Sequence, residues 1–247
     1  MKISRDYSVW KCTVVDNARP TLAHVEIKAA PGSGMDFNPP DDDGYVDGTA
    51  AATDGFMLAV VPIKLFQPGE GFDYARSGFI DPDIPGIVDP VVFVAALKIA
   101  KKRRENDLII DLAKSDLAGL RDGSWLPRQN DPTLTGNFPD WRPIVPKRQR
   151  AQDREHQLMS MNFQPQFLVT VANAIGCQVA LSGRGSGNGS GLPRVIFGSP
   201  NDDGSSNDPI VVEPSTAEIG STFDPPFGLI MPVHYTLTDP NRFYNQD

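Results

Sequence analysis

The sequence predicts an α+β fold made of repeated units, each with a helix followed by short antiparallel strands. Two observations lead to this prediction. A helix pattern followed by strand patterns occurs at residues 90–146 and again at 162–237, and a helix-poor version occupies residues 1–65. In addition, the 247 residues include 23 Pro and 22 Gly, which is typical of many short elements joined by turns.

The helix-poor unit is expected to begin with strands. RPTLAHVEIKA (19–29) alternates apolar and polar residues, which is the pattern of a half-buried strand. After a loop, YVDGTAAAT and FMLAVVPI predict a hairpin. We expect the turn at Asp54-Gly55, because Asp-Gly is the commonest chemistry for a two-residue hairpin loop.

The clearest helix pattern is VVFVAALKIAKKRREND (91–107). Phe93, Ala96, Leu97 and Ala100 fall on one stripe of this helix, and lysines fall on another. LIIDLA then predicts a strand, and short strands are expected to follow as far as residue 130. The prolines of NFPDWRPIVPKRQR exclude a central strand or a helix there.

A charged linker at 147–157 marks the predicted boundary between two domains, at 1–150 and 151–247. NFQPQFLVTVANAIG (162–176) predicts a second short helix, ended by Gly176. CQVALSG, LPRVIFGS and DPIVVEP predict strands. A final strand is expected at 227–237, and the proline inside it places it at an edge or a bulge.

The net charge of −8 excludes a protein that is basic overall. Residues 1–150 contain 19 Lys and Arg against 21 Asp and Glu, while residues 151–247 contain 4 against 10. An acidic protein with one basic face is typical of loose contact with nucleic acid, but a solvated helix end gives the same pattern. The basic run that raises this question comprises Lys98, Lys101, Lys102, Arg103 and Arg104.

Motifs of catalytic and ligand sites are absent or incomplete. GRGSGNGSG (183–191) is followed by Leu-Pro instead of the Lys-Ser/Thr of a phosphate loop, so it predicts a flexible hairpin loop. The sequence has no GxSxG or HExxH motif. His24, His156 and His234 lack the spacing of metal ligands. We therefore expect no catalysis, no cofactor and no metal site.

The sequence also bears on the compartment. No stretch approaches the ~20 apolar residues of a membrane span, and the opening MKISRDYSVWK lacks the apolar core of a signal peptide. Cys12 and Cys177 are two isolated cysteines, so a disulfide framework is not expected. These features predict a cytoplasmic protein.

Three segments together resemble the bacterial DNA polymerase sliding clamp, the β subunit of the replicative polymerase. ATDGFMLAV (52–60) is similar to the family's ATDGHRLAV, NFPDWRPIVP (137–146) to its FPDYRRVLP, and GLIMPVH (228–234) to its final VMPMRL strand. They occur in the family's order. The resemblance implies a DNA-clamp-like fold in which residues 1–150 correspond to the middle domain, with a shortened N-terminal helix, and residues 151–247 to the second half of the last domain.

In that family the three segments form one pocket that receives a short peptide from polymerases, the clamp loader and repair proteins. The resemblance therefore implies a DNA polymerase or another protein with such a peptide as partner, and duplex DNA contacted without sequence preference. By position, the pocket comprises Thr53, Gly55, Phe56, Met57, Leu58, Pro139, Pro143, Ile144, Leu229, Ile230, Met231, Pro232 and Val233. The DNA-contacting residues would be Lys98, Lys101, Lys102 and Arg104.

The chain departs from the family in two ways. Phe56-Met57 stands where the family has His-Arg, and Pro143 stands where it has Arg, which makes the pocket more apolar. The first domain and the first half of the last domain have no counterpart, as in a shortened clamp of a phage or mobile element. Ring function would then require a homo-oligomer, which we expect to form through the sheet edges of the first and last strands.

Two other functions fit the same residues. The chain could be a clamp-derived peptide-binding adaptor or decoy that never encircles DNA. It could also be a structural protein in which the motifs coincide by chance. DNA binding and a closed oligomer distinguish the clamp from the adaptor, and failure to bind any clamp-binding peptide favours the structural protein.

Overall fold

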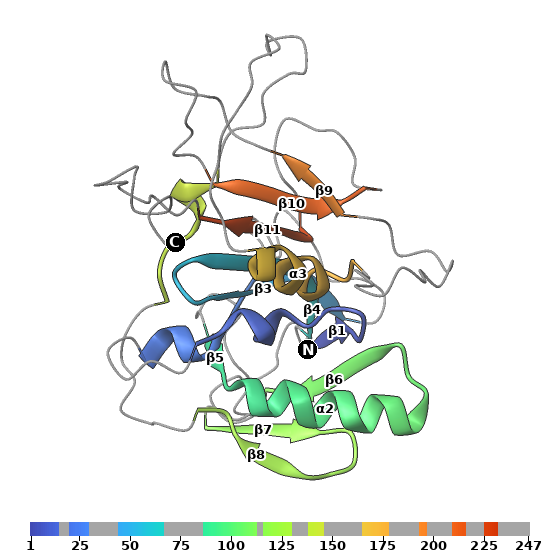
Figure 1. The fold of residues 1–247 in the computed structure, drawn as a ribbon. Coiled ribbons are helices and arrows are strands. Elements are labelled where there is room, and N and C mark those ends of the chain that lie inside the picture. Colours follow the sequence, from blue (N-terminus) through green and yellow to red (C-terminus); the bar gives the residue numbers. More distant parts are fainter. Residues whose placement is uncertain are drawn as a thin grey trace, which may run out of the picture.

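The computed structural model describes residues 1–14, 20–29, 44–66, 86–112, 116–129, 138–145, 165–177, 193–196, 209–215 and 225–231. These ranges contain α-helices, 3-10 helices (η) and strands whose pairings are all antiparallel, which confirms the predicted α+β class (Figure 1). In chain order the elements are β1 (Lys2–Ser4), η1 (Val9–Cys12), η2 (Pro20–Ala23), β2 (Val25–Ala29), β3 (Tyr45–Thr53), β4 (Met57–Phe66), β5 (Gly86–Val88), α2 (Pro90–Arg103), β6 (Asp107–Asp111), β7 (Leu117–Leu120), β8 (Trp125–Pro127), η3 (Arg142–Ile144), α3 (Pro165–Ala174), β9 (Pro193–Ile196), β10 (Ile210–Pro214) and β11 (Phe227–Ile230).

The described strands form one branched sheet. Its main path runs β5-β2-β3-β4-β1-β6-β7-β8, and β11, β10 and β9 branch from β4. The branch exists because β4 is ten residues long and β1 only three. β1 pairs with β4 at Lys64, which leaves the same edge of β4 open at residues 57–60, where β11 pairs.

This topology corrects the expectation that the first and last strands are sheet edges. β1 lies between β4 and β6, and β11 lies between β4 and β10. Within the described part of the chain, the strands with a partner on one side only are β5, β8 and β9. Any association through a sheet edge in this region must therefore use one of these three.

The β3–β4 hairpin is the centre of the sheet and confirms the predicted hairpin, with Thr53 paired to Leu58. The first five residues of β4 are all buried, without the alternation of a strand that has one wet face. Two layers account for this pattern. η1 and α3 cover one face, and residues 138–145 cover the other.

Helix α2 confirms the predicted helix and shows why it begins and ends where it does. The Asp89 side chain accepts a hydrogen bond from the Val91 N–H at 2.7 Å, and proline occupies the first helical position. Arg104 is left-handed, with φ 60°, and the Glu105 N–H donates to the Ala100 carbonyl, so the helix ends at Arg103, before the predicted end at residue 107. Phe93, on the buried stripe, stacks against Trp10 of η1.

Helix α3 lies against the sheet near β3 and β4 in Figure 1 and also packs on β10 and β11. Its predicted end is confirmed, since Gly176 has φ 86° and the Cys177 N–H donates to the Ala172 carbonyl. Gly228 of β11 allows the close approach, because a Cβ there would lie 2.1 Å from Cγ1 of Val171.

The remaining expectations fall partly outside the described ranges. The strand predicted at 19–29 is a 3-10 turn followed by β2, and the short N-terminal helix is the single turn of η1. β9, β10 and β11 confirm three of the later strands. The predicted linker at 147–157, the strand CQVALSG (177–183) apart from Cys177, the loop at 183–191 and the segment 232–247 lie outside the described residues. No helix in the described ranges has the length and apolar character to cross a membrane.

Candidate functional site

The structure brings the three motif segments together. β11 pairs antiparallel with the start of β4, with Leu229 opposite Leu58 and Ile230 opposite Met57. The pairing continues one step further, because the Met231 N–H donates to the Phe56 carbonyl at 2.7 Å. Residues 138–145, called the 138–145 segment below, pack on the same two strands.

The hairpin tip is held by its own side chains. The Asp54 carboxylate accepts hydrogen bonds from the Phe56 and Met57 N–H groups, both at 2.8 Å. The Thr53 hydroxyl donates to the Met57 carbonyl at 2.7 Å and accepts from the Gly55 N–H at 3.0 Å. Asp54 pairs with Met57, so the two loop residues are Gly55, with φ 92°, and Phe56. The turn therefore lies one residue beyond the predicted Asp-Gly pair, and Phe56 is at its tip.

A hydrophobic cluster, called the Trp141 cluster, joins the three segments on one face of the sheet. Leu58 and Leu229 form its floor, and Phe138 and Trp141 cover them. Trp141 meets Phe227 edge to face, with ring centroids 5.8 Å apart. The buried members are Ala51, Leu58, Val60, Phe138, Trp141, Val211, Phe227 and Leu229.

Strand alternation divides the predicted pocket residues between two faces. Leu58 and Leu229 belong to the Trp141 cluster, whereas their strand neighbours Met57 and Ile230 belong to the main core. Successive side chains of a strand point to opposite faces, so these two pairs cannot line one groove. Met231 continues the alternation, which puts it on the same face as Leu229. Pro232 and Val233 lie outside the described residues.

The outer surface of the 138–145 segment is apolar and exposed. Pro139, Pro143 and Ile144 are all exposed, and Ile144 retains 44% of its accessible surface. Arg142 and Asp140 form a local ion pair at 3.5 Å beside them. These three exposed apolar residues, called the wall below, belong to the segment whose Phe138 and Trp141 are buried with Leu58 and Leu229.

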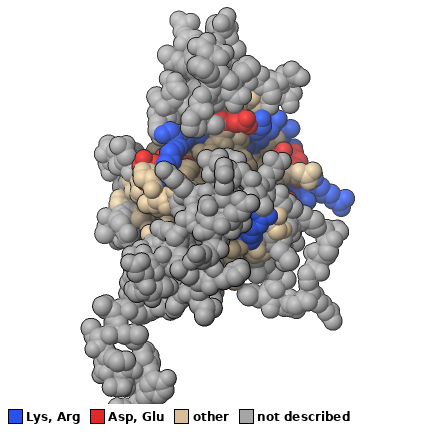
Figure 2. Space-filling view, turned by 90° about the horizontal axis from the view of Figure 1, so that it is seen from above, with Lys and Arg blue, Asp and Glu red and all other residues tan. Residues whose placement is uncertain are grey.

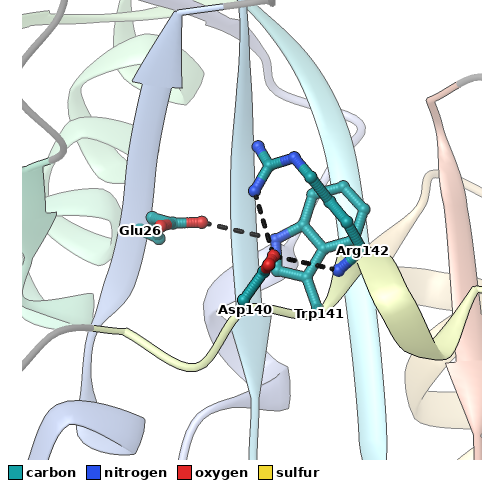
Figure 3. Close-up of polar contacts among 4 residues, drawn as sticks. All are labelled: Glu26, Asp140, Trp141 and Arg142. Carbon is teal, nitrogen blue, oxygen red and sulfur yellow. Dashed lines mark hydrogen bonds and ion pairs between the residues drawn. The ribbon is translucent and has the colours of Figure 1, made fainter.

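Trp141 is fixed by a residue from outside all three motifs (Figure 3). Its indole N–H donates to the Glu26 carboxylate at 3.3 Å, and both side chains are buried. Burial raises the pKa of Glu26, and the hydrogen bond from Trp141 and the nearby Arg142 oppose that rise. The Arg142 guanidinium lies 4.6 Å from the centre of the Trp141 ring.

Phe56 connects the hairpin tip to helix α3. It is 52% exposed, and its ring stacks on that of Phe167, with centroids 6.2 Å apart and planes 18° from parallel. The family that the sequence resembles has His at this position. An aromatic pair here replaces a polar tip with an apolar one.

The four basic residues predicted to contact DNA are all exposed on the second half of α2 and just beyond it. Lys98 and Lys101 are on the helix, and Arg104 ends it. The basic surface of α2 is short, because the exposed residues nearer the start of the helix include the apolar Val91 and Val94. On the face seen in Figure 2, described Lys and Arg side chains lie among Asp and Glu instead of forming an unbroken basic surface.

The two cysteines are buried in the structure. Burial raises the pKa of the Cys177 thiol to about 11 and raises that of Cys12 as well, so neither is a reactive thiolate. Within the described ranges, no three His, Cys, Asp or Glu side chains group closely enough to hold a metal ion.

Sequence reasoning missed the residues that assemble this face. Glu26, Trp141, Phe138 and Phe227 were absent from the predicted pocket, although each contacts or anchors it. One feature of the sequence could have pointed to Glu26. A glutamate between two apolar residues of a short strand, as in Val-Glu-Ile, is ordinarily on a wet face, and here it faces a buried tryptophan.

Comparison with known proteins identifies the fold. No family model and no curated protein sequence matches the chain. Solved structures of bacterial sliding clamps do match it. They include the DNA polymerase III beta chain from Streptococcus pneumoniae TIGR4, with a TM-score of 0.56, 12% identity, and coverage of 95% of this chain and 64% of that one. The DNA polymerase sliding clamp from Pseudomonas aeruginosa matches with a TM-score of 0.55, 12% identity, and coverage of 95% and 66%.

The fold is therefore that of the bacterial DNA polymerase sliding clamp, as the sequence motifs predicted. The chain spans 64% of the length of the Streptococcus pneumoniae protein. About one residue in eight is identical between this chain and those clamps, so the likeness shows the fold alone.

Proposed function

We propose that this chain is a sliding-clamp-like DNA replication accessory protein, without catalysis, that binds a short peptide of a polymerase or another partner. The observation that carries the proposal is the convergence of the hairpin tip, the 138–145 segment and β11 on one face. These are the segments that resemble the clamp's peptide pocket. The clamp fold supports the same function.

The chemistry of the face suits an apolar peptide. Ile144, Pro139 and Pro143 are exposed on the segment that covers the buried leucines, and Met231, just after β11, is partly exposed. Aliphatic or aromatic anchor side chains bind such surfaces by burying apolar area, and Met adapts to their shape. The sliding clamp from Pseudomonas aeruginosa has been solved bound to griselimycin, at 11% identity and a TM-score of 0.55. We propose that griselimycin and the partner peptide compete for this face.

DNA contact and assembly belong to the same proposal. Lys98, Lys101, Lys102 and Arg104 are exposed and would bind phosphates without reading sequence, as a protein that slides requires. For assembly, we propose that the protein forms a homo-oligomer. We place the protein in the cytoplasm, as a shortened clamp of the kind a phage or mobile element encodes, with residues 1–150 and 151–247 as its two clamp-like parts.

One observation favours the adaptor as a second candidate. Helix α3, PQFLVTVANA, has no charged residue, so among the described α-helices only α2 carries basic residues. An adaptor that binds the peptide without encircling DNA needs no further basic surface.

Peptide binding tests the proposal directly. The ligand is a short fluorescein-labelled peptide ending in Leu-Phe, called the probe peptide below, and the readout is fluorescence polarisation. We expect saturable binding that unlabelled griselimycin displaces. Binding without any DNA affinity would favour the adaptor, and no binding of either compound would contradict a peptide-docking function.

A further inference from the structure

Glu26 is an unexpected residue at its position in β2. It is only 7% exposed, and it lies between the buried Val25 and Ile27. It pairs with Ala51 of β3, so its side chain shares a face with a small residue of the Trp141 cluster, which leaves room above the sheet. A buried carboxylate is costly unless it makes an interaction that an apolar residue cannot make.

The interaction that Glu26 makes is with the 138–145 segment. Its Oε2 accepts the indole N–H of Trp141, a residue 115 positions away in sequence. Figure 3 shows the Glu26 side chain pointing from its strand toward the indole nitrogen, while Arg142 lies over the indole ring. Phe227 meets the same ring edge to face. Trp141 is thus held by Glu26, Phe227 and Arg142.

The position of Trp141 sets the position of the exposed wall. Trp141 directly precedes η3, which contains Pro143 and Ile144. The Ile144 N–H donates to the Trp141 carbonyl at 3.2 Å, and the Val145 N–H donates to the Arg142 carbonyl at 3.2 Å. A shift of the indole therefore moves the turn that carries the wall.

We propose that Glu26 is a positioning residue, whose carboxylate oxygen fixes Trp141 and through it the Pro143–Ile144 wall of the peptide-docking face. The positioning itself depends only on the contacts of Glu26 and Trp141. Its consequence for peptide affinity rests on the proposed function.

The test compares two substitutions that treat the acceptor differently. Glu26→Gln keeps an oxygen that can accept the indole N–H, whereas Glu26→Leu has similar size and no acceptor. Glu105→Leu is the matched control, because it removes a carboxylate that faces Arg121 instead of the 138–145 segment. Amide hydrogen exchange by mass spectrometry measures protection of residues 140–145 separately from that of α2 and the β7–β8 hairpin.

We expect Glu26→Leu to raise exchange of residues 140–145 by roughly five- to tenfold, the factor that corresponds to removing one buried hydrogen bond. In Glu26→Leu, exchange in α2 and β7–β8 should not change. In Glu26→Gln and Glu105→Leu, exchange of residues 140–145 should stay within about twofold of that in the parent protein. Trp141→Phe should raise exchange of residues 140–145 by a similar factor. Adding Glu26→Leu to Trp141→Phe should raise it little further. Equal exchange of residues 140–145 in the parent and in Glu26→Leu would overturn the proposal, as would a uniform rise across all segments.

Probe-peptide affinity separates this proposal from the function on which it builds. We expect Glu26→Leu to weaken binding at least about threefold and Glu26→Gln to retain it. If the parent protein does not bind the probe peptide, the docking function fails and hydrogen exchange still decides the positioning. If the parent binds and Glu26→Leu binds equally well, the link between Glu26 and the wall is wrong.

Discussion

Leu58 of β4 and Leu229 of β11 lie directly opposite each other in an antiparallel pair, although they are far apart in the sequence. Both are buried in the Trp141 cluster, beneath the 138–145 segment. This pairing joins the C-terminal motif to the hairpin motif in one sheet. The candidate site exists because β11 fills the stretch of the β4 edge that the short β1 leaves open.

The docking of α3 on β11 predicts that Gly228 cannot be enlarged. In Gly228→Ala the new methyl would meet Val171 Cγ1 and the Leu58 carbonyl, so we expect a loss of about 2 kcal/mol or more of unfolding free energy. Urea denaturation measures this loss of unfolding free energy. Val171→Ala in the same protein should restore part of the loss, because it removes the clashing methyl.

The control for this substitution is Gly123→Ala. Gly123 has φ 87° and open space around its Cβ position, so only backbone strain of about 1 kcal/mol is expected. Equal losses at the two glycines would mean that the close approach of α3 is unimportant for stability.

The buried carboxylate of Glu26 predicts a pH dependence. Because burial raises its pKa above the ordinary 4.5, the folded state binds the proton more tightly than the unfolded state. Its contribution to stability is therefore greatest below about pH 4.5 and falls as the pH rises through the folded pKa. Arg142 and Lys28 reduce this effect, and Asp140 increases it.

Glu26→Gln removes this titration while keeping the acceptor. We expect the stability of Glu26→Gln relative to the parent to be higher at pH 8 than at pH 4, as measured by urea denaturation at both values. The same difference at the two pH values would contradict the assignment of a raised pKa to Glu26.

The basic end of α2 predicts weak, sequence-independent DNA binding. Lys101 and Lys102 are exposed and off the buried stripe, so changing both to Glu should leave folding intact. For duplex DNA, removing one phosphate-binding side chain should reduce the log–log salt slope by about 0.9. Lys64→Ala is the control, since Lys64 pairs with Asp47 on the β3–β4 hairpin. An unchanged slope in the Lys101→Glu, Lys102→Glu protein would show that the basic run is only a solvated helix end.

Self-association is predicted to use an open edge of the described sheet. Of the edge strands β5, β8 and β9, β8 has an exposed large apolar side chain, Trp125. Light scattering at tens of micromolar should show an oligomer, and Trp125→Lys should reduce its mass. Val94→Lys, on the exposed surface of α2, should leave the mass of the oligomer unchanged. A monomer at this concentration, also with DNA present, would contradict a ring and favour the adaptor.

The local elements were predictable because their signals are local. The apolar stripe predicted α2 and Gly176 predicted the end of α3, whereas the start of α2 at Asp89-Pro90 was not predicted. The turn was predicted one residue too early because Asp54 acts through its side chain, which caps the loop instead of entering it.

The assembly of the site was less predictable. The three motifs were expected to meet from resemblance, but nothing local encodes the β4–β11 register. The pocket prediction took consecutive residues such as Leu229 and Ile230 as lining one groove, although strand alternation sends them to opposite faces. Glu26 was missed because its role depends on Trp141, far away in the sequence.

Peptide docking is tested by calorimetric titration of the probe peptide into the parent protein and two variants. Met231 follows Leu229 on the docking face and is partly exposed, so Met231→Ala should remove part of the contact with a peptide anchor at little cost in stability. Asp116→Ala, on an exposed position outside all three motifs, is the control. We expect the probe peptide to bind the parent and Asp116→Ala, and to bind Met231→Ala at least about threefold more weakly. No binding to the parent, or equal effects of the two substitutions, would contradict peptide docking at this face.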